Sequence, residues 1–218
     1  SWVTVKPGEV TDLATVIVSR DPLDRTIFWE QGAQLRRHDK LDIFGLMGGE
    51  VLVIDVGDAP LRRFLLDLPA HTVPNAQLLG SLTYLANEQL DDAFDMALRH
   101  DAIVTNVRDL LDVTGTWTLS DATTALQHRM RGANLRAALV TLGAEGCHVV
   151  TEAERKRVPA YQVEVVDPTG AGHAFVAGMA WGMAQRLGEA VSGQAGTMAE
   201  TMLSTIKEVG DEATGDAI

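Results

Sequence analysis

The sequence has a single cysteine, few aromatic side chains and no long run of apolar residues. Cys147 cannot form a disulfide within the chain and belongs to no zinc-ligand cluster, which is consistent with a reducing compartment such as the cytoplasm. No stretch approaches the roughly 18 apolar residues of a membrane span, and the first residues lack the pattern of a signal peptide. Basic residues are also outnumbered: 18 Lys and Arg against 30 Asp and Glu leave a net charge of -12, which argues against binding nucleic acid or an anionic membrane through bulk charge.

What is present is the composition of an ordinary globular protein. Of the 218 residues, 46% are hydrophobic and 22% are charged, which excludes disorder along the whole chain and allows a sizeable core. Apolar runs typical of buried strands alternate with helical segments, which predicts an α/β fold with a doubly wound, mostly parallel sheet and helices on both faces. We expect a single domain overall, with a β-rich, lid-like part at residues 1–35 and an α/β core at residues 36–218. The predicted strands lie at 2–5, 14–18, 25–29, 51–54, 77–85, 102–105, 137–142, 148–150 and 158–166, and the predicted helices at 59–68, 88–100, 120–131 and 172–186.

The most informative segment is a glycine-rich turn, DPTGAGH, which runs from Asp167 to His173 between a predicted strand and a predicted helix. Glycines let the backbone approach a ligand closely, and the first N–H groups of the helix then point at that ligand with the positive end of the helix dipole. Such a turn makes a cradle for a phosphate or another oxyanion. The alternative is a helix start that needs glycines only to turn, and the spacing alone does not separate the two interpretations.

A second turn, TLGAEG, runs from Thr141 to Gly146 directly after another predicted buried strand. In doubly wound sheets such strand ends line the ligand crevice. Taken alone, this pattern is weak, and an ordinary turn between two strands explains it better.

Together, in this order, the two turns resemble the nucleotide-binding turn and the second signature of the ribokinase-like, or PfkB, family of carbohydrate and nucleoside kinases. Residues 101–109 with 114–115 resemble the N-x-x-E strand end of that family, and residues 25–27 and 53–55 resemble two of its earlier strands. The resemblance covers nearly the whole chain. It implies a ribokinase-like fold and transfer of the γ-phosphoryl group of ATP to an alcohol group of a sugar or nucleoside.

The resemblance also implies a role for each residue of the two turns and of the N-x-x-E position. Phosphoryl transfer depends mainly on positioning and charge neutralisation. The cofactors implied are ATP and Mg²⁺, together with the K⁺ or other monovalent cation of many members. On this template the anion hole comprises Gly170, Ala171 and Gly172, the nucleotide contacts are Thr141, Gly143, Gly146 and Asn106, the Mg²⁺ ligand through water is Asp109, and the monovalent-cation loop contains Asp167 and Thr169.

The chain departs from the family pattern at its catalytic base. The second signature of the family ends in G-A-G-D, and here His173 replaces the Asp that takes the proton from the substrate hydroxyl. An imidazole can act as a general base, since much of it is neutral at pH 7. His173 can equally be a structural remnant of a site that has lost its base, and both interpretations stay open at this point.

Two further departures concern the acceptor site and the metal position. Asp109 stands where the family has Glu, a shortening that a water molecule could compensate around Mg²⁺. The family's first strand, its substrate-binding Asp and its Gly-Gly segment have no counterpart in the sequence, so the chain looks processed or cut and the acceptor site looks incomplete.

We therefore carry two hypotheses: a kinase of this family, and a catalytically inactive relative that serves as a scaffold or subunit of a larger complex. In either case a homodimer formed through strands of residues 1–35, or a larger assembly, is an expected partner arrangement.

Overall fold

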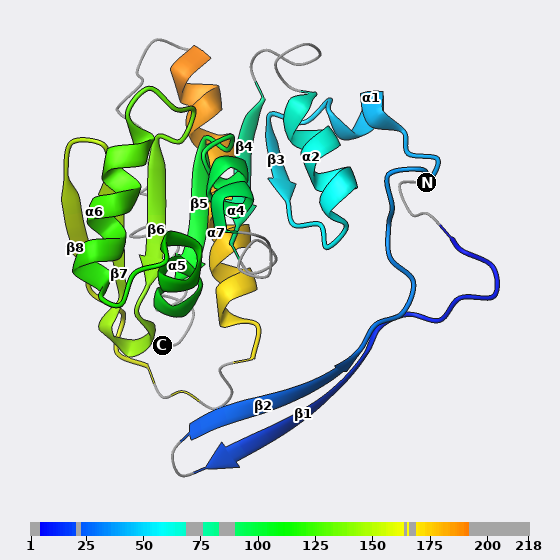
Figure 1. The fold of residues 1–218 in the computed structure, drawn as a ribbon, viewed down its shortest axis with the longest axis horizontal. Helices are drawn as coiled ribbons and strands as arrows, with labels where there is room; N and C mark the ends of the chain where they lie inside the picture. The colour runs from blue at the N-terminus through cyan, green and yellow to red at the C-terminus, as the bar shows by residue number, and fades with distance from the viewer. Residues whose placement is uncertain are drawn as a thin grey trace.

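The computed structural model describes residues 5–20, 23–68, 76–82, 90–163, 165 and 169–191. These residues form two separate β-sheets, which Figure 1 shows. The larger sheet has six strands in the order β3-β4-β5-β6-β7-β8, and the smaller one is an antiparallel ribbon of β1 and β2. The fold is therefore mixed α/β with a central, mostly parallel sheet, as the sequence predicts.

Four parallel strands bring their carboxyl ends to one edge of the large sheet. β3 pairs in parallel with β4, β4 with β5, and β5 with β6. β7 then pairs antiparallel with β6, and β8 with β7. The strands are β3 Val51–Ile54, β4 Gln77–Ser81, β5 Ala102–Asn106, β6 Ala137–Thr141, β7 Cys147–Thr151 and β8 Arg155–Val158. Because open α/β sheets bind ligands at the carboxyl ends of their strands, the residues that follow β3, β5 and β6 are placed for function.

Helices cover both faces of this sheet. α2, α4, α5 and α6 pack on one face, where their apolar side chains join those of the strands in the larger core. α7 covers the other face against β3 and β4, and its Met179 and Met183 are buried in a second core cluster. Figure 1 shows α7 running opposite to the parallel strands, so its N-terminus lies at their carboxyl edge. The helices are α1 Ile43–Leu46, α2 Ala59–Asp67, α4 Leu90–Ala97, α5 Val107–Thr114, α6 Leu119–Met130 and α7 Ala171–Val191.

The helix starts follow from side-chain caps. An Oδ atom of Asp58 accepts the N–H of Leu61 at the start of α2. The hydroxyl of Thr118 accepts the N–H of Asp121 at the start of α6, so this helix begins at Leu119, one residue before the predicted start. A side chain that accepts from the third helical residue satisfies an N–H group that has no partner inside the helix.

The strand predicted at 158–166 is misplaced. The structure puts β8 at Arg155–Val158, where three basic side chains on an exposed edge strand hide the apolar pattern that a buried strand shows. Pro159 follows directly and has no N–H to continue the ladder. Residues 2–4 of the first predicted strand, and residues 83–89 of the predictions at 77–85 and 88–100, lie outside the described residues.

The ribbon of β1 (Leu13–Arg20) and β2 (Leu23–Glu30) extends from the body of the molecule on the side of the carboxyl edge (Figure 1). Its register pairs Val16 with Ile27 and Thr15 with Phe28. Apolar side chains are exposed on both faces of the ribbon, among them Phe28 at 59% and Trp29 at 51%. The division of the chain at residue 35 into a lid and a core stays a prediction.

His100 is a buried histidine between α4 and β4, with 1% of its surface exposed. Its Nδ1 lies 3.1 Å from the carbonyl oxygen of Met96, and its ring lies against Gly80 of β4. Among the atoms that the structure describes, its Nε2 has no hydrogen-bond partner. Burial lowers the pKa of His100 to about 4, because the imidazolium would lose its hydration without a replacement.

We expect the chain to lose stability as the pH falls from about 6.5 towards about 4. An unfolded histidine titrates near pH 6.5, whereas the pKa of folded His100 is about 4, so in this window the unfolded state binds the additional proton. The stabilisation is complete above the unfolded pKa and falls by about 1.4 kcal/mol per pH unit inside the window. Urea unfolding across this range should show a flatter pH dependence for His100→Gln than for the natural chain. Equal slopes in the two chains would contradict the prediction.

Candidate active site

The first turn of α7 lies at the carboxyl edge of the parallel strands, and its first backbone N–H groups have no partner within the helix. The helical ladder begins where Ala174 N–H donates to the carbonyl of Gly170, so the N–H groups of residues 171–173 precede the ladder. Gly170 has a φ of 83°, a left-handed conformation that glycine adopts without strain. A Cβ atom at Gly170 or Gly172 would meet no described atom within 4 Å. Neither backbone conformation nor packing therefore requires Gly172, although a helical glycine costs about 1 kcal/mol relative to alanine. Close approach of a ligand to Gly172 stays a prediction.

The turn after β6 contains two glycines with different surroundings. Gly143 has a φ of 60°, and a Cβ there would meet nothing within 4 Å. Gly146 has a φ of 97°, and a Cβ there would clash with the backbone of residues 158–160. Packing alone therefore explains Gly146, while Gly143 faces open space. Thr141 ties this turn to the neighbouring strand, because its hydroxyl donates to the carbonyl of Thr105 over 3.2 Å. The contacts of these residues with a nucleotide stay predictions.

Asn106 and Asp109 are joined at the carboxyl end of β5. Asn106 Oδ1 accepts the N–H of Asp109 over 2.8 Å, and Asn106 Nδ2 donates to the Asp109 carboxylate over 2.9 Å. Asn106 caps α5, and the hydrogen bond from its Nδ2 holds the Asp109 carboxylate at the edge of the sheet. Magnesium in phosphoryl-transfer sites takes one or two carboxylates together with water and phosphate oxygens, so a single Asp of this kind fits the ion. The described ranges contain no group of three His, Cys, Asp or Glu side chains that could hold a metal alone.

Asp55 is a candidate residue that the sequence analysis missed. It directly follows β3, and desolvation by its surroundings raises the pKa of its carboxyl group. The charges of His173, in the first turn of α7, and of Arg62, on α2, oppose this rise. Asp55 and His173 lie at the same edge of the sheet, and both side chains are exposed; among the described residues no hydrogen bond or ion pair joins them. The visible signal was an acidic residue that directly follows a predicted strand.

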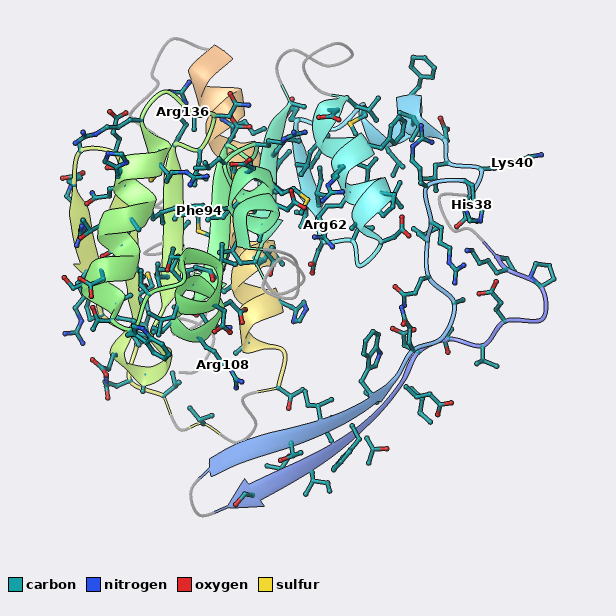
Figure 2. All side chains as sticks on the ribbon, in the orientation of Figure 1. His38, Lys40, Arg62, Phe94, Arg108 and Arg136 are labelled. Atoms are coloured by element: carbon teal, nitrogen blue, oxygen red, sulfur yellow. The ribbon has the colours of Figure 1, made fainter. Side chains whose placement is uncertain are left out.

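Two arginines accompany this edge of the sheet. Arg62 is buried, and its guanidinium donates to the carbonyls of Val56 at 2.8 Å and Gly57 at 3.3 Å, which holds the loop after β3. Arg108 is exposed at the start of α5, and Figure 2 shows it at the end of the sheet that faces the ribbon. An exposed guanidinium at this position adds positive charge where an anionic ligand would bind.

Other predicted residues contribute less. Asp167 lies outside the described residues and Thr169 is exposed, so the monovalent-cation loop stays a prediction. Cys147 is buried, and burial raises the pKa of its thiol to about 11. A thiol in this state supplies almost no thiolate near neutral pH, which excludes it as the nucleophile.

Comparison with known proteins identifies the family of this chain. The profile of the family described as "pfkB family carbohydrate kinase" matches residues 1–203. The chain belongs to the pfkB family of carbohydrate kinases. In the described part of this pfkB-family chain, no helix combines the length and the apolar character needed to cross a bilayer.

Relatives of this pfkB-family chain carry the same architecture. A probable fructokinase-4 of Arabidopsis thaliana is 36% identical over 92 residues, which are 42% of this chain and 26% of that protein. The adenosine kinase of Sinorhizobium meliloti superposes with a TM-score of 0.69 at 22% identity, over 88% of this chain and 57% of that one. A double-mutant fructokinase of Vibrio cholerae, solved with fructose, ADP and potassium ion bound, superposes with a TM-score of 0.62 at 19% identity, over 89% of this chain and 63% of that one. At these identities the two structures show the shared fold, and the pfkB-family chain spans less than two thirds of each of these relatives.

Proposed function

We propose that this chain binds ATP at the carboxyl edge of its sheet and transfers the γ-phosphoryl group to a hydroxyl of a sugar or nucleoside. The observation that carries the proposal is the open glycine turn at the start of α7, where neither the backbone conformation nor any described neighbour requires Gly172. Membership of the pfkB family supports the reaction class, and the fructokinase and adenosine kinase among the relatives support the two acceptor classes.

The chain's own groups have distinct roles in this reaction. The backbone N–H groups of Gly170, Ala171 and Gly172 hold the oxygens of the transferring phosphoryl group, with the positive end of α7 behind them. The turn at Gly143 lies along the nucleotide, beside Asn106. His173 accepts the proton of the attacking hydroxyl, which a positioned base does with a gain of about 10²–10⁴-fold.

Metal ions complete the proposed site. Asp109, held by Asn106, would bind Mg²⁺ through water, and Thr169 with Asp167 would hold a monovalent cation. When bound, Mg²⁺ neutralises charge on the phosphate oxygens. The chain's own contribution is the fixed position of the Asp109 carboxylate at the end of β5.

Titration calorimetry with Mg²⁺ and a non-hydrolysable ATP analogue tests this proposal. We expect binding by the natural chain, and a loss of more than about tenfold in affinity for Gly172→Val, because the added methyl groups fill the space in front of the turn. Ala177→Val is the matched control, since Ala177 is exposed on the same helix away from its first turn. No binding by the folded natural chain would overturn the kinase proposal and favour the scaffold hypothesis.

A further inference from the structure

We propose that Arg108 binds the diphosphate part of the nucleotide at the carboxyl ends of β5 and β6. This inference rests on the proposed phosphoryl transfer and adds a ligand-binding residue to that site. Arg108 is the second residue of α5, and its side chain is exposed at the end of the sheet that faces the ribbon (Figure 2). It occupies a variable position of the N-x-x-E pattern, which therefore assigns it no role.

An arginine at the start of α5 does not stabilise the helix. The first turn of a helix is the positive end of its dipole, which favours a carboxylate such as that of Asp109 and disfavours a cation. Asp112 lies four residues further along α5, at the spacing of a helical ion pair, yet among the described residues no ion pair joins it to Arg108. An uncharged residue at this position would therefore serve the helix as well or better.

The guanidinium of Arg108 is available to a ligand. It has no hydrogen bond or ion pair with any residue that the structure describes. Exposed arginines on two neighbouring helices do have partners, since Arg63 of α2 pairs with Asp92 at 3.0 Å and Arg129 of α6 pairs with Asp95 at 2.9 Å. Arg108 thus keeps the N–H donors of its planar fork free.

The register of the sheet places Arg108 beside the turn that we propose for the nucleotide. Asn106 and Thr141 are Cα partners in the parallel strands β5 and β6, and neighbouring strands lie about 4.8 Å apart. Two residues beyond these partners the chain reaches Arg108 after one strand and Gly143 after the other. A Cβ at Gly143 would meet no described atom within 4 Å, so this turn leaves room for a ligand next to the start of α5.

Phosphate chemistry accounts for an arginine at this position. A guanidinium stays ionised near neutral pH and binds two oxygens of a phosphate through parallel N–H groups. The chain has a net charge of -12, and Asp55 and Asp109 both follow strands at this edge, so a polyphosphate needs local positive charge to bind there. The first turn of α7 is proposed to hold the transferring phosphoryl group, which leaves the α- and β-phosphates for Arg108.

Titration calorimetry with Mg²⁺ and ADP measures this contact without turnover. We expect Arg108→Gln to weaken ADP binding by about 10- to 100-fold, the usual range for a hydrogen bond to a charged group, and Arg108→Lys to restore part of the affinity. The loss should agree within about twofold between ADP and the non-hydrolysable ATP analogue, because both carry the α- and β-phosphates. Arg131→Gln is the matched control, since Arg131 is exposed and lies between the end of α6 and β6, at the opposite edge of the sheet.

The outcomes separate this assignment from the proposed function. Equal ADP affinity in Arg108→Gln and the natural chain would overturn the assignment and leave the proposed function standing. A loss confined to the ATP analogue, or to fructose 6-phosphate as a phosphorylated acceptor, would overturn it as well, because Arg108 would then bind a different phosphate. No binding of ADP or of the ATP analogue by the folded natural chain would overturn the proposed function, and the assignment with it.

Urea unfolding of the ligand-free chain tests for a structural role of Arg108. We expect Arg108→Gln to unfold at the same urea concentration as the natural chain or at a higher one, because the variant removes a cation from the positive end of α5. A lower midpoint would overturn the assignment, since it would show that Arg108 stabilises the fold and that the loss of affinity follows from damage to α5.

Discussion

Replacement of His173 by glutamine is expected to lower kcat for phosphoryl transfer by about 10²–10⁴-fold, the usual contribution of a positioned general base. Glutamine keeps a polar side chain of similar reach but cannot accept a proton near neutral pH. The backbone of the α7 turn remains, so calorimetric affinity for the ATP analogue should stay within about twofold of the natural chain. A coupled assay of ADP release, run over a panel of sugars and nucleosides, measures the effect.

His173→Asp is the informative companion variant. It restores the carboxylate of the family pattern, but it also places two carboxylates, Asp55 and the new one, at the same edge of the sheet. The new carboxylate and Asp55 carry like charges, which disfavours their simultaneous ionisation, so we expect this variant to be slower than the natural chain. Unchanged turnover in His173→Gln, together with a gain in His173→Asp, would contradict the prediction and show that His173 is a remnant.

Gly80→Ala is expected to destabilise the fold by about 3 kcal/mol, through overpacking of a core site. A Cβ at this position of β4 would lie 2.5 Å from Nε2 and 2.6 Å from Cδ2 of His100. The ring cannot move away freely, because it is buried and its Nδ1 lies within hydrogen-bond distance of the carbonyl of Met96. A change of this size shifts the folding equilibrium constant by about 100-fold, which urea unfolding resolves.

A double-mutant cycle tests whether the contact with His100 causes the destabilisation by Gly80→Ala. In a His100→Ala background the space beside β4 is vacant, so Gly80→Ala should cost less than about 1 kcal/mol there. Gly172→Ala is the control for a glycine without neighbours and should leave stability unchanged or raise it by up to about 1 kcal/mol. Equal costs of Gly80→Ala in both backgrounds would show that the strand backbone, and not the His100 ring, resists the methyl group.

The parts of the fold that the sequence predicts are those with a local signal. The apolar runs at 102–105 and 137–142 reflect strands that are buried on both faces, and the run at 51–54 also corresponds to a strand, although Val53 is 47% exposed there. β8 has three basic residues in four and lies at an exposed edge, so no apolar pattern reveals it. Its position depends on pairing with β7, which is a tertiary effect.

The candidate site also has features that the local sequence predicts and features that depend on the folded structure. The glycine turns can be found from spacing, but only packing separates Gly146, which the backbone of residues 158–160 requires, from Gly172, which no neighbour requires. The N-x-x-D pattern places Asn106 and Asp109 together because Asn106 is the N-cap of α5 and Asp109 lies in its first turn. The side chain of Asn106 therefore reaches the N–H of Asp109. Asp55 has no such local relation to α7, whose first turn reaches the same edge of the sheet only in the folded chain.

The strands of the large sheet lie in the same order across the sheet as along the chain. Each described strand after β3 can therefore join an edge that has already been synthesised, and none of them must insert between two earlier ones, which shortens the sequence separation of the paired strands. α7 emerges last among the described elements and closes the face that holds Leu79, Val104 and Leu139. The same docking event brings the glycine turn and His173 to the sheet edge, so completion of the core and assembly of the proposed site are one step of folding.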